Sequence, residues 1–116
     1  MADPQNDEIK VTVDGGQFYT FARAMKRAYT PSRLGEVILA VRGERLIIET
    51  MRGGSLLACT PAPPVTARIL GGNFLNLVHL ASDAQATGPL TIVFRPTLGE
   101  IGLPHIGTKA KFDQPA

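Results

Sequence analysis

A chain of 116 residues, of which 44% are hydrophobic and 19% charged, has the size and composition of one globular domain and excludes a disordered polymer. Its single cysteine excludes an internal disulfide framework, and no apolar run approaches the roughly 18 residues that a membrane-spanning helix needs. The net charge is only +2, so nucleic-acid binding would have to depend on where the basic residues lie. Because the N-terminus is polar rather than signal-like, we expect a cytoplasmic protein with no membrane partner.

The first half of the chain predicts one strand, one helix and three further strands. Residues 1–8 are polar and are expected to form a flexible leader. Apolar residues then alternate with polar ones, as in a half-buried strand, before the period changes to the i, i+3, i+4 spacing of a helix face. Thr30 precedes a proline, which disfavours helical geometry and predicts the end of the helix near Tyr29. The predicted elements are a strand at 9–13, a helix at 17–29, and strands at 36–41, 45–50 and 55–60.

The second half predicts the same order of elements. Residues 61–64 contain three prolines and are expected to form an extended connector between the halves. Pro96 and Pro104 fall in predicted turns, as the hydrogen bonding of a sheet requires. The predicted elements are a strand at 65–70, a helix at 73–82, and strands at 90–94, 100–103 and 107–112, followed by a tail at 113–116.

A tetrapeptide repeat links the two halves. Gly-Gly-Gln-Phe at 15–18 returns as Gly-Gly-Asn-Phe at 71–74, which is 56 positions later, and each copy lies between a predicted strand and a predicted helix. Both helices carry equivalent apolar stripes, in which the two phenylalanines hold the same position. We therefore predict one domain at 9–112, made of two βαβββ halves at 9–60 and 65–112, with the two helices side by side.

A family resemblance is carried by the opening strand at 10–13, the hairpin of 37–41 with 46–48, and the strand 65–68 that leads into the helix at 73–77. These segments resemble a single domain of the DNA sliding clamps, the processivity rings of replicative polymerases. The resemblance implies an α+β fold in which two helices pack on one face of antiparallel sheets. Sliding-clamp rings contain six such domains, so it also implies that six copies of this one-domain chain would close a ring.

The first helix offers a candidate DNA-contacting face. With Phe18 as zero at ~100° per residue, Arg23 lies at about 140°, Arg27 at about 180°, and Lys26 at the flank. The basic residues therefore lie opposite the apolar stripe, and the sliding-clamp resemblance implies that they meet DNA phosphates without reading sequence. A solvated helix face that simply carries charge is the alternative interpretation. The outward positions of the second helix are neutral: Leu75, Asn76 and His79.

No residue pattern points to an enzyme. The two histidines, His79 and His105, have no Cys, Asp or Glu at ligand spacing, so no metal site is predicted. Cys59 lies in a predicted apolar strand and is interpreted as a small core residue rather than a nucleophile. The paired glycines lack the Gly-Lys-Ser/Thr ending of a phosphate-binding loop, so no cofactor is predicted. We expect a protein without catalytic residues.

Two functions of different classes fit these patterns. In the first, the chain forms a homo-oligomer and contacts duplex DNA without sequence specificity through Arg23, Lys26 and Arg27. Such a one-domain fold exposes sheet edges at both ends, which predicts association edge to edge. In the second, the same fold is a stand-alone regulatory module that binds a protein partner. Ile38 and Ile47 make the second face of the predicted hairpin apolar too, which indicates buried surface that both functions would use.

Overall fold

The computed structural model describes residues 8–28, 35–51, 53–84, 88–104 and 106–113, with the side chains of 25–28 and 80–84 excepted. The order strand, helix, strand, strand, strand occurs twice and is followed by a short extra strand. In chain order the elements are β1 (Ile9–Asp14), α1 (Gly15–Ala28), β2 (Glu36–Arg42), β3 (Arg45–Thr50), β4 (Gly53–Ala58), β5 (Val65–Leu70), α3 (Gly71–Ala84), β6 (Pro89–Arg95), β7 (Glu100–Leu103), β8 (Ile106–Lys109) and β9 (Lys111–Phe112).

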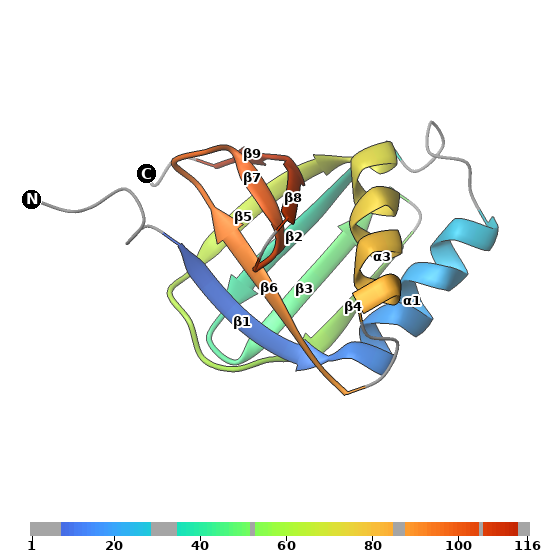
Figure 1. Ribbon diagram of the computed structural model, residues 1–116, viewed down its shortest axis with the longest axis horizontal. Helices are drawn as coiled ribbons and strands as arrows, with labels where there is room; N and C mark the ends of the chain where they lie inside the picture. Colours follow the sequence, from blue (N-terminus) through green and yellow to red (C-terminus); the bar gives the residue numbers. More distant parts are fainter. Residues whose placement is uncertain (1–7, 29–34, 52, 85–87, 105, 114–116) are drawn as a thin grey trace, which may run out of the picture.

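The strands form two antiparallel sheets (Figure 1). One has the order β1-β6-β7-β8 and the other the order β4-β3-β2-β5-β9. The first strand of each half therefore lies in the sheet of the other half, because β1 pairs with β6 and β5 pairs with β2. This exchange ties the halves into one unit, since neither sheet is complete without a strand from the other half. The expected α+β class, with two helices and antiparallel sheets, is confirmed.

The two exchanged strands pair in matching registers. Val13 pairs with Leu90 in the four-stranded sheet, and Ile69 pairs with Val37 in the five-stranded sheet. In sequence, 56 residues separate Val13 from Ile69 and 53 separate Val37 from Leu90. The same two shifts hold along both strand pairs, so the halves are equivalent residue by residue where they meet.

The entry to each helix repeats the same backbone contact. The Gly15 N–H donates to the Gly88 carbonyl at 2.8 Å, and the Gly71 N–H donates to the Gly35 carbonyl at 2.7 Å. Both acceptors have positive φ, 63° at Gly35 and 90° at Gly88, a region that glycine enters without steric cost. Each helix is therefore fixed at its start to the loop before the second strand of the opposite half.

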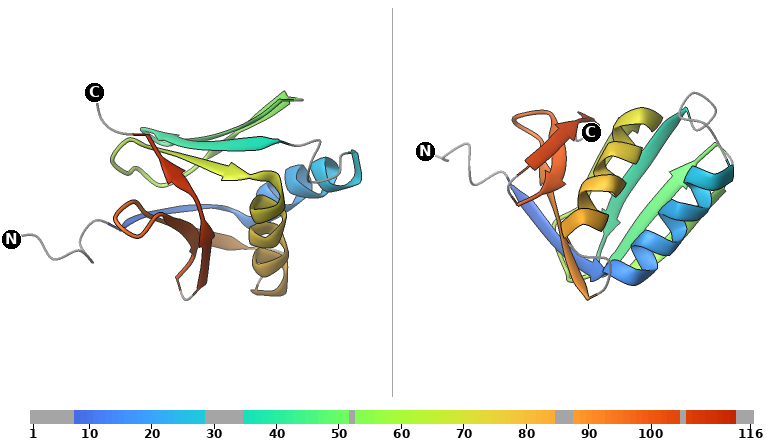
Figure 2. Two further views of the ribbon diagram at one scale, coloured as in Figure 1. Left: turned by 90° about the horizontal axis from the view of Figure 1, so that it is seen from above. Right: turned by 45° about the vertical axis from the view of Figure 1, so that its right-hand side comes forward.

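The helices lie side by side on one side of the molecule and contact both sheets (Figure 2). The rings of Phe18 and Phe74 meet edge to face, with centroids 6.4 Å apart, and both side chains are buried. The core between the sheets is apolar, and no polar or charged side chain is buried among the described residues. Its largest buried members besides the two phenylalanines are Phe94, Leu39, Leu46, Ile48, Ile69, Leu77, Ile92 and Ile101.

Both helices begin two residues earlier than predicted. The paired glycines belong to the first helical turn, although glycine is a poor helix former and typically marks a turn. Gly15 and Gly71 are buried, and the loop contacts described above hold their N–H groups in place. The predicted helix end at Tyr29 lies outside the described residues.

The single strand predicted at 107–112 is wrong. β8 ends at Lys109, and β9 joins the other sheet, where Phe112 pairs with Ala67. The Ala110 N–H between them donates to the Gly99 carbonyl at 2.9 Å, so the chain crosses from one sheet to the other at this residue. Asp113, expected at the start of the tail, is held too, because its N–H donates to the Thr66 carbonyl at 3.1 Å.

Candidate functional site

One side of α1 faces outward because its opposite side is anchored in the core. Asp14 caps the helix, since its Oδ1 accepts a hydrogen bond from the Gln17 N–H at 2.9 Å. Phe18 and Ala22 follow at i and i+4 and are buried. Rotation of the helix about its axis would expose these two side chains, so the outward face is fixed by packing.

Arg23 lies on this outward face. Its side chain is exposed, as are those of Thr20 and Ala24. The guanidinium lies over the ring of Tyr19, 5.3 Å from the centroid, which steadies it along the helix. Within the described residues Arg23 forms no ion pair. Lys26 and Arg27, the other two predicted DNA-contacting residues, belong to the last turns of α1, and their side chains lie outside the described part.

The outward face of α3 differs from that of α1. Asn76 and His79 are exposed there, whereas Leu75, expected to face outward, is half-buried against the core. The segment Gly71–Ala84 contains neither lysine nor arginine. Among the described side chains of the two neighbouring helices, Arg23 of α1 is therefore the arginine that the structure places on the outer face, and no lysine or arginine on α3 matches it.

Each sheet ends on a strand with one open edge. Among the described residues, β4 pairs only with β3, and β8 pairs only with β7. The Cys59 N–H donates to the Glu44 carbonyl at 2.9 Å. Bonded pairs alternate along an antiparallel ladder, so the N–H group of Leu56 points away from β3, whereas beyond Ala58 the bridge from Cys59 to Val13 brings β1 to this side. The β4 edge thus offers a free donor at Leu56 to another strand.

A groove that the sequence did not reveal lies where β5, α3 and the β8–β9 crossing meet. Its volume is about 380 Å³, a size typical of ligand and side-chain pockets. The two leucines that line it are exposed to 67% each, although they are large apolar side chains. Its lining includes the apolar Leu70 and Leu98, the polar Asn73 and the basic Lys109 and Lys111.

Several residues that line the groove lie at positions where the second half differs from the first. Leu70 stands where the first half has Asp14, the residue that caps α1. Lys109 opposes the first residue of β7 as Ala58 opposes the first residue of β3. Leu98 belongs to a turn that is two residues longer than its counterpart between β2 and β3. Alignment of the two halves was the signal that could have found this site.

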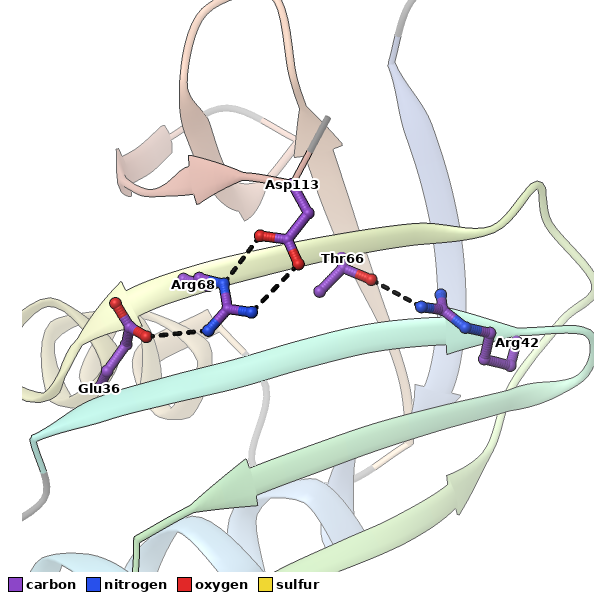
Figure 3. Close-up of polar contacts among 5 residues, drawn as sticks. All are labelled: Glu36, Arg42, Thr66, Arg68 and Asp113. Atoms are coloured by element: carbon purple, nitrogen blue, oxygen red, sulfur yellow. Dashed lines mark hydrogen bonds and ion pairs between the residues drawn. The ribbon is translucent and has the colours of Figure 1, made fainter. Parts of the chain in front are cut away.

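A polar network lies beside the groove on the outer face of the five-stranded sheet (Figure 3). Arg68 donates from Nε to Asp113 Oδ1 at 2.7 Å and from Nη1 to Glu36 Oε1 at 3.2 Å. The hydrogen bond from Arg68 holds the pKa of Asp113 below its usual value of 3.8. Nearby, Arg42 donates from Nη2 to Thr66 Oγ1 at 2.8 Å. Arg68 thus forms ion pairs with two carboxylates. Lys109 and Lys111, in contrast, have no ion pair within the described residues.

The residues considered for chemistry do not come together. Cys59 follows β4 directly and bridges to Val13 on β1. Burial, and secondarily the charge of Glu44, raise the pKa of its thiol, which disfavours the reactive thiolate. No cluster of three or more His, Cys, Asp or Glu residues that could hold a metal occurs in the described part of the chain. His79 is exposed on α3, and His105 lies outside the described residues.

Comparison of the chain with protein-family models, with curated proteins and with solved structures finds no match. In the described part of the chain, no helix is both long enough and apolar enough to cross a membrane.

Proposed function

We propose that this chain is a non-enzymatic, clamp-like protein that self-associates and contacts duplex DNA without sequence specificity. The observation that carries the proposal is the internal repeat, with its exchanged strands, matching registers and adjacent helices. This is the arrangement expected of a sliding-clamp domain, which the chain resembles in sequence. In such domains the paired helices face the DNA, and here they share one outer face.

The DNA contact is assigned to the outward face of α1. Arg23 is exposed there and has no ion pair in the part of the chain that the structure describes, and Lys26 and Arg27 follow on the same helix. Cations at the spacing of one helical turn meet phosphates along a groove without reading base edges. The lack of lysine and arginine on α3 keeps the affinity of one chain low, so binding depends on several copies.

Self-association is assigned to the open edges of β4 and β8. One copy's β4 would pair with the β8 of its neighbour and continue a sheet across the contact. The two edges are at equivalent positions of the two halves but are different strands, so the contact between copies is head to tail. Such contacts close into a ring when the rotation from one copy to the next divides a full turn.

A salt series of duplex binding tests the DNA contact. Fluorescence anisotropy with labelled duplexes of unrelated sequence should give the same affinity for each, with log K falling by roughly 0.9 per log unit of salt for each phosphate contact. The Arg23→Glu/Arg27→Glu variant should lose binding at low salt. Lys10→Glu/Lys111→Glu makes the same change in net charge at exposed positions of the sheets and should retain most of the affinity. Equal losses of affinity for the two variants would show that binding depends on net charge alone and would contradict the assignment to α1.

The groove favours a second candidate function, the stand-alone module that binds a protein partner. Its exposed leucines, and its lysines without an ion pair among the described residues, are positions that the repeat does not require. They suit an apolar side chain flanked by carboxylates. The same titration separates the two candidates. If the wild-type protein binds no duplex at low salt, the DNA contact is wrong and the protein-binding module is favoured.

A further inference from the structure

The outer face of the five-stranded sheet carries an apolar row that the proposed function does not use. The helices and the other sheet lie on one side of this sheet, and no described element covers its other side (Figure 2). Three apolar residues lie next to one another across the strands on this open side, because Ile47 pairs with both Leu56 and Ala40. Leu56 is 55% exposed and Ile47 is half-buried, whereas Ala40 is buried, so Leu56 and Ile47 form the accessible part of the row.

Two opposite charges flank this row symmetrically on β3. Arg45, Ile47 and Glu49 alternate with the buried Leu46 and Ile48, so all three face outward. Arg45 and Glu49 are exposed, and neither has an ion pair within the described residues. Each stands two residues from Ile47, so the charges are about 13 Å apart with the isoleucine midway.

This pattern is complementary to itself. A twofold axis running across the strands above Ile47 reverses the direction of β3 in the second copy. Arg45 of each copy then faces Glu49 of the other, while Ile47 meets Ile47 and Leu56 meets Leu56. On β4, Gly54 would face Ala58, so small residues meet beside the row.

The distances allow these contacts. Sheets stack about 10 Å apart, which an arginine and a glutamate side chain span together. Packed sheets are typically rotated by about 30° relative to each other. Arg45 and Glu49 each lie about 6.5 Å from Ile47, so this rotation displaces them by only about 3 Å from their partners. The flexible arginine side chain accommodates this displacement.

We infer that two copies of this chain associate face to face through the outer surfaces of their five-stranded sheets, with β3 antiparallel to β3 and two Arg45–Glu49 ion pairs across the interface. The occupant is a second copy rather than another protein, because one strand supplies both partners of each ion pair in an order that only reversal matches. The inference is independent of the DNA contact and of the edge pairing between β4 and β8, since the face and the edge of a sheet point in perpendicular directions.

Charge exchange at positions 45 and 49, followed by sedimentation velocity over a concentration series, tests this inference. The R45E and E49R variants each place like charges opposite one another and should weaken the face-to-face dimer at least about tenfold. The R45E/E49R double variant restores opposite charges and should dimerise as the wild type does. An equimolar mixture of R45E and E49R should also dimerise, because both carboxylates then lie on one partner and both arginines on the other, so that each carboxylate faces an arginine.

The edge pairing between β4 and β8 does not use these two charges. Association that all variants share is therefore assigned to the edge, and association that follows the charge pattern is assigned to the face. Thermal melts should show an intact fold for every variant, because both charged residues are exposed. Dimerisation that is indifferent to the single exchanges, or a double variant and a mixture that both stay monomeric, would overturn the inference.

Discussion

Replacing Phe74 with alanine should lower the free energy of unfolding by about 3–5 kcal/mol, and replacing Phe18 should have an effect of the same size. Both side chains are at most 1% exposed, and their rings meet edge to face where the two helices touch. Truncation removes the buried surface of a ring and leaves a cavity between helices that are fixed at their starts by loop contacts. The loss is a large part of the 5–15 kcal/mol that typically stabilises a domain.

Urea unfolding of each variant measures these losses. Leu98→Ala is the matched control, because this leucine is 67% exposed and its truncation should change stability by no more than about 0.5 kcal/mol. The double variant should lose less than the sum of the two single losses, since each truncation already removes the ring contact. An unchanged midpoint for either single variant would show that the two halves are not equivalent at their helix contact.

The Gly102→Ala variant should be destabilised by about 1–3 kcal/mol, with the damage concentrated at the β7–β8 pairing. A Cβ at this position would run into the Ile106 carbonyl oxygen and would stand 2.5 Å from the Gly107 Cα, and both obstacles are backbone. Gly102 and Gly107 oppose each other across the ladder, so neither strand can yield without breaking its register. Hydrogen exchange at β8 should accelerate more than at β3 of the other sheet. Equal rates in the variant and the wild type would show that the strands are further apart than described.

The local patterns of the sequence predicted the elements well. The apolar spacings predicted the order of strands and helices, because they depend on positions within one element. The tetrapeptide repeat predicted that the two helices are equivalent and lie side by side, and the contact between Phe18 and Phe74 agrees with this. The starts of the helices were misplaced by two residues, since propensity treats paired glycines as a turn. Their burial and long-range N–H contacts, which no local pattern contains, extend the helices over them.

Features that depend on distant pairing could not be predicted. The exchange of β1 and β5 between sheets follows from ladder partners more than 20 residues away, as does the departure of β9 from β8 at Ala110. Predicting the groove also required knowledge of distant positions. An exposed leucine at position 70 is informative only by comparison with Asp14, its equivalent in the first half. Of the predicted DNA-contacting residues, Arg23 could be placed on an exposed face from helical periodicity alone.

The central claim, that copies of this chain assemble edge to edge, is tested most directly by its mass in solution. Sedimentation equilibrium should give a weight-average mass that rises with concentration above the 12.4 kDa of one chain. Leu56→Pro removes an N–H that points away from β3, so it should leave the fold intact and weaken this assembly at least about tenfold relative to Leu56→Ala, which keeps the N–H. A wild-type mass that stays at 12.4 kDa up to high micromolar concentration, or an assembly that Leu56→Pro and Leu56→Ala change equally, would contradict the account.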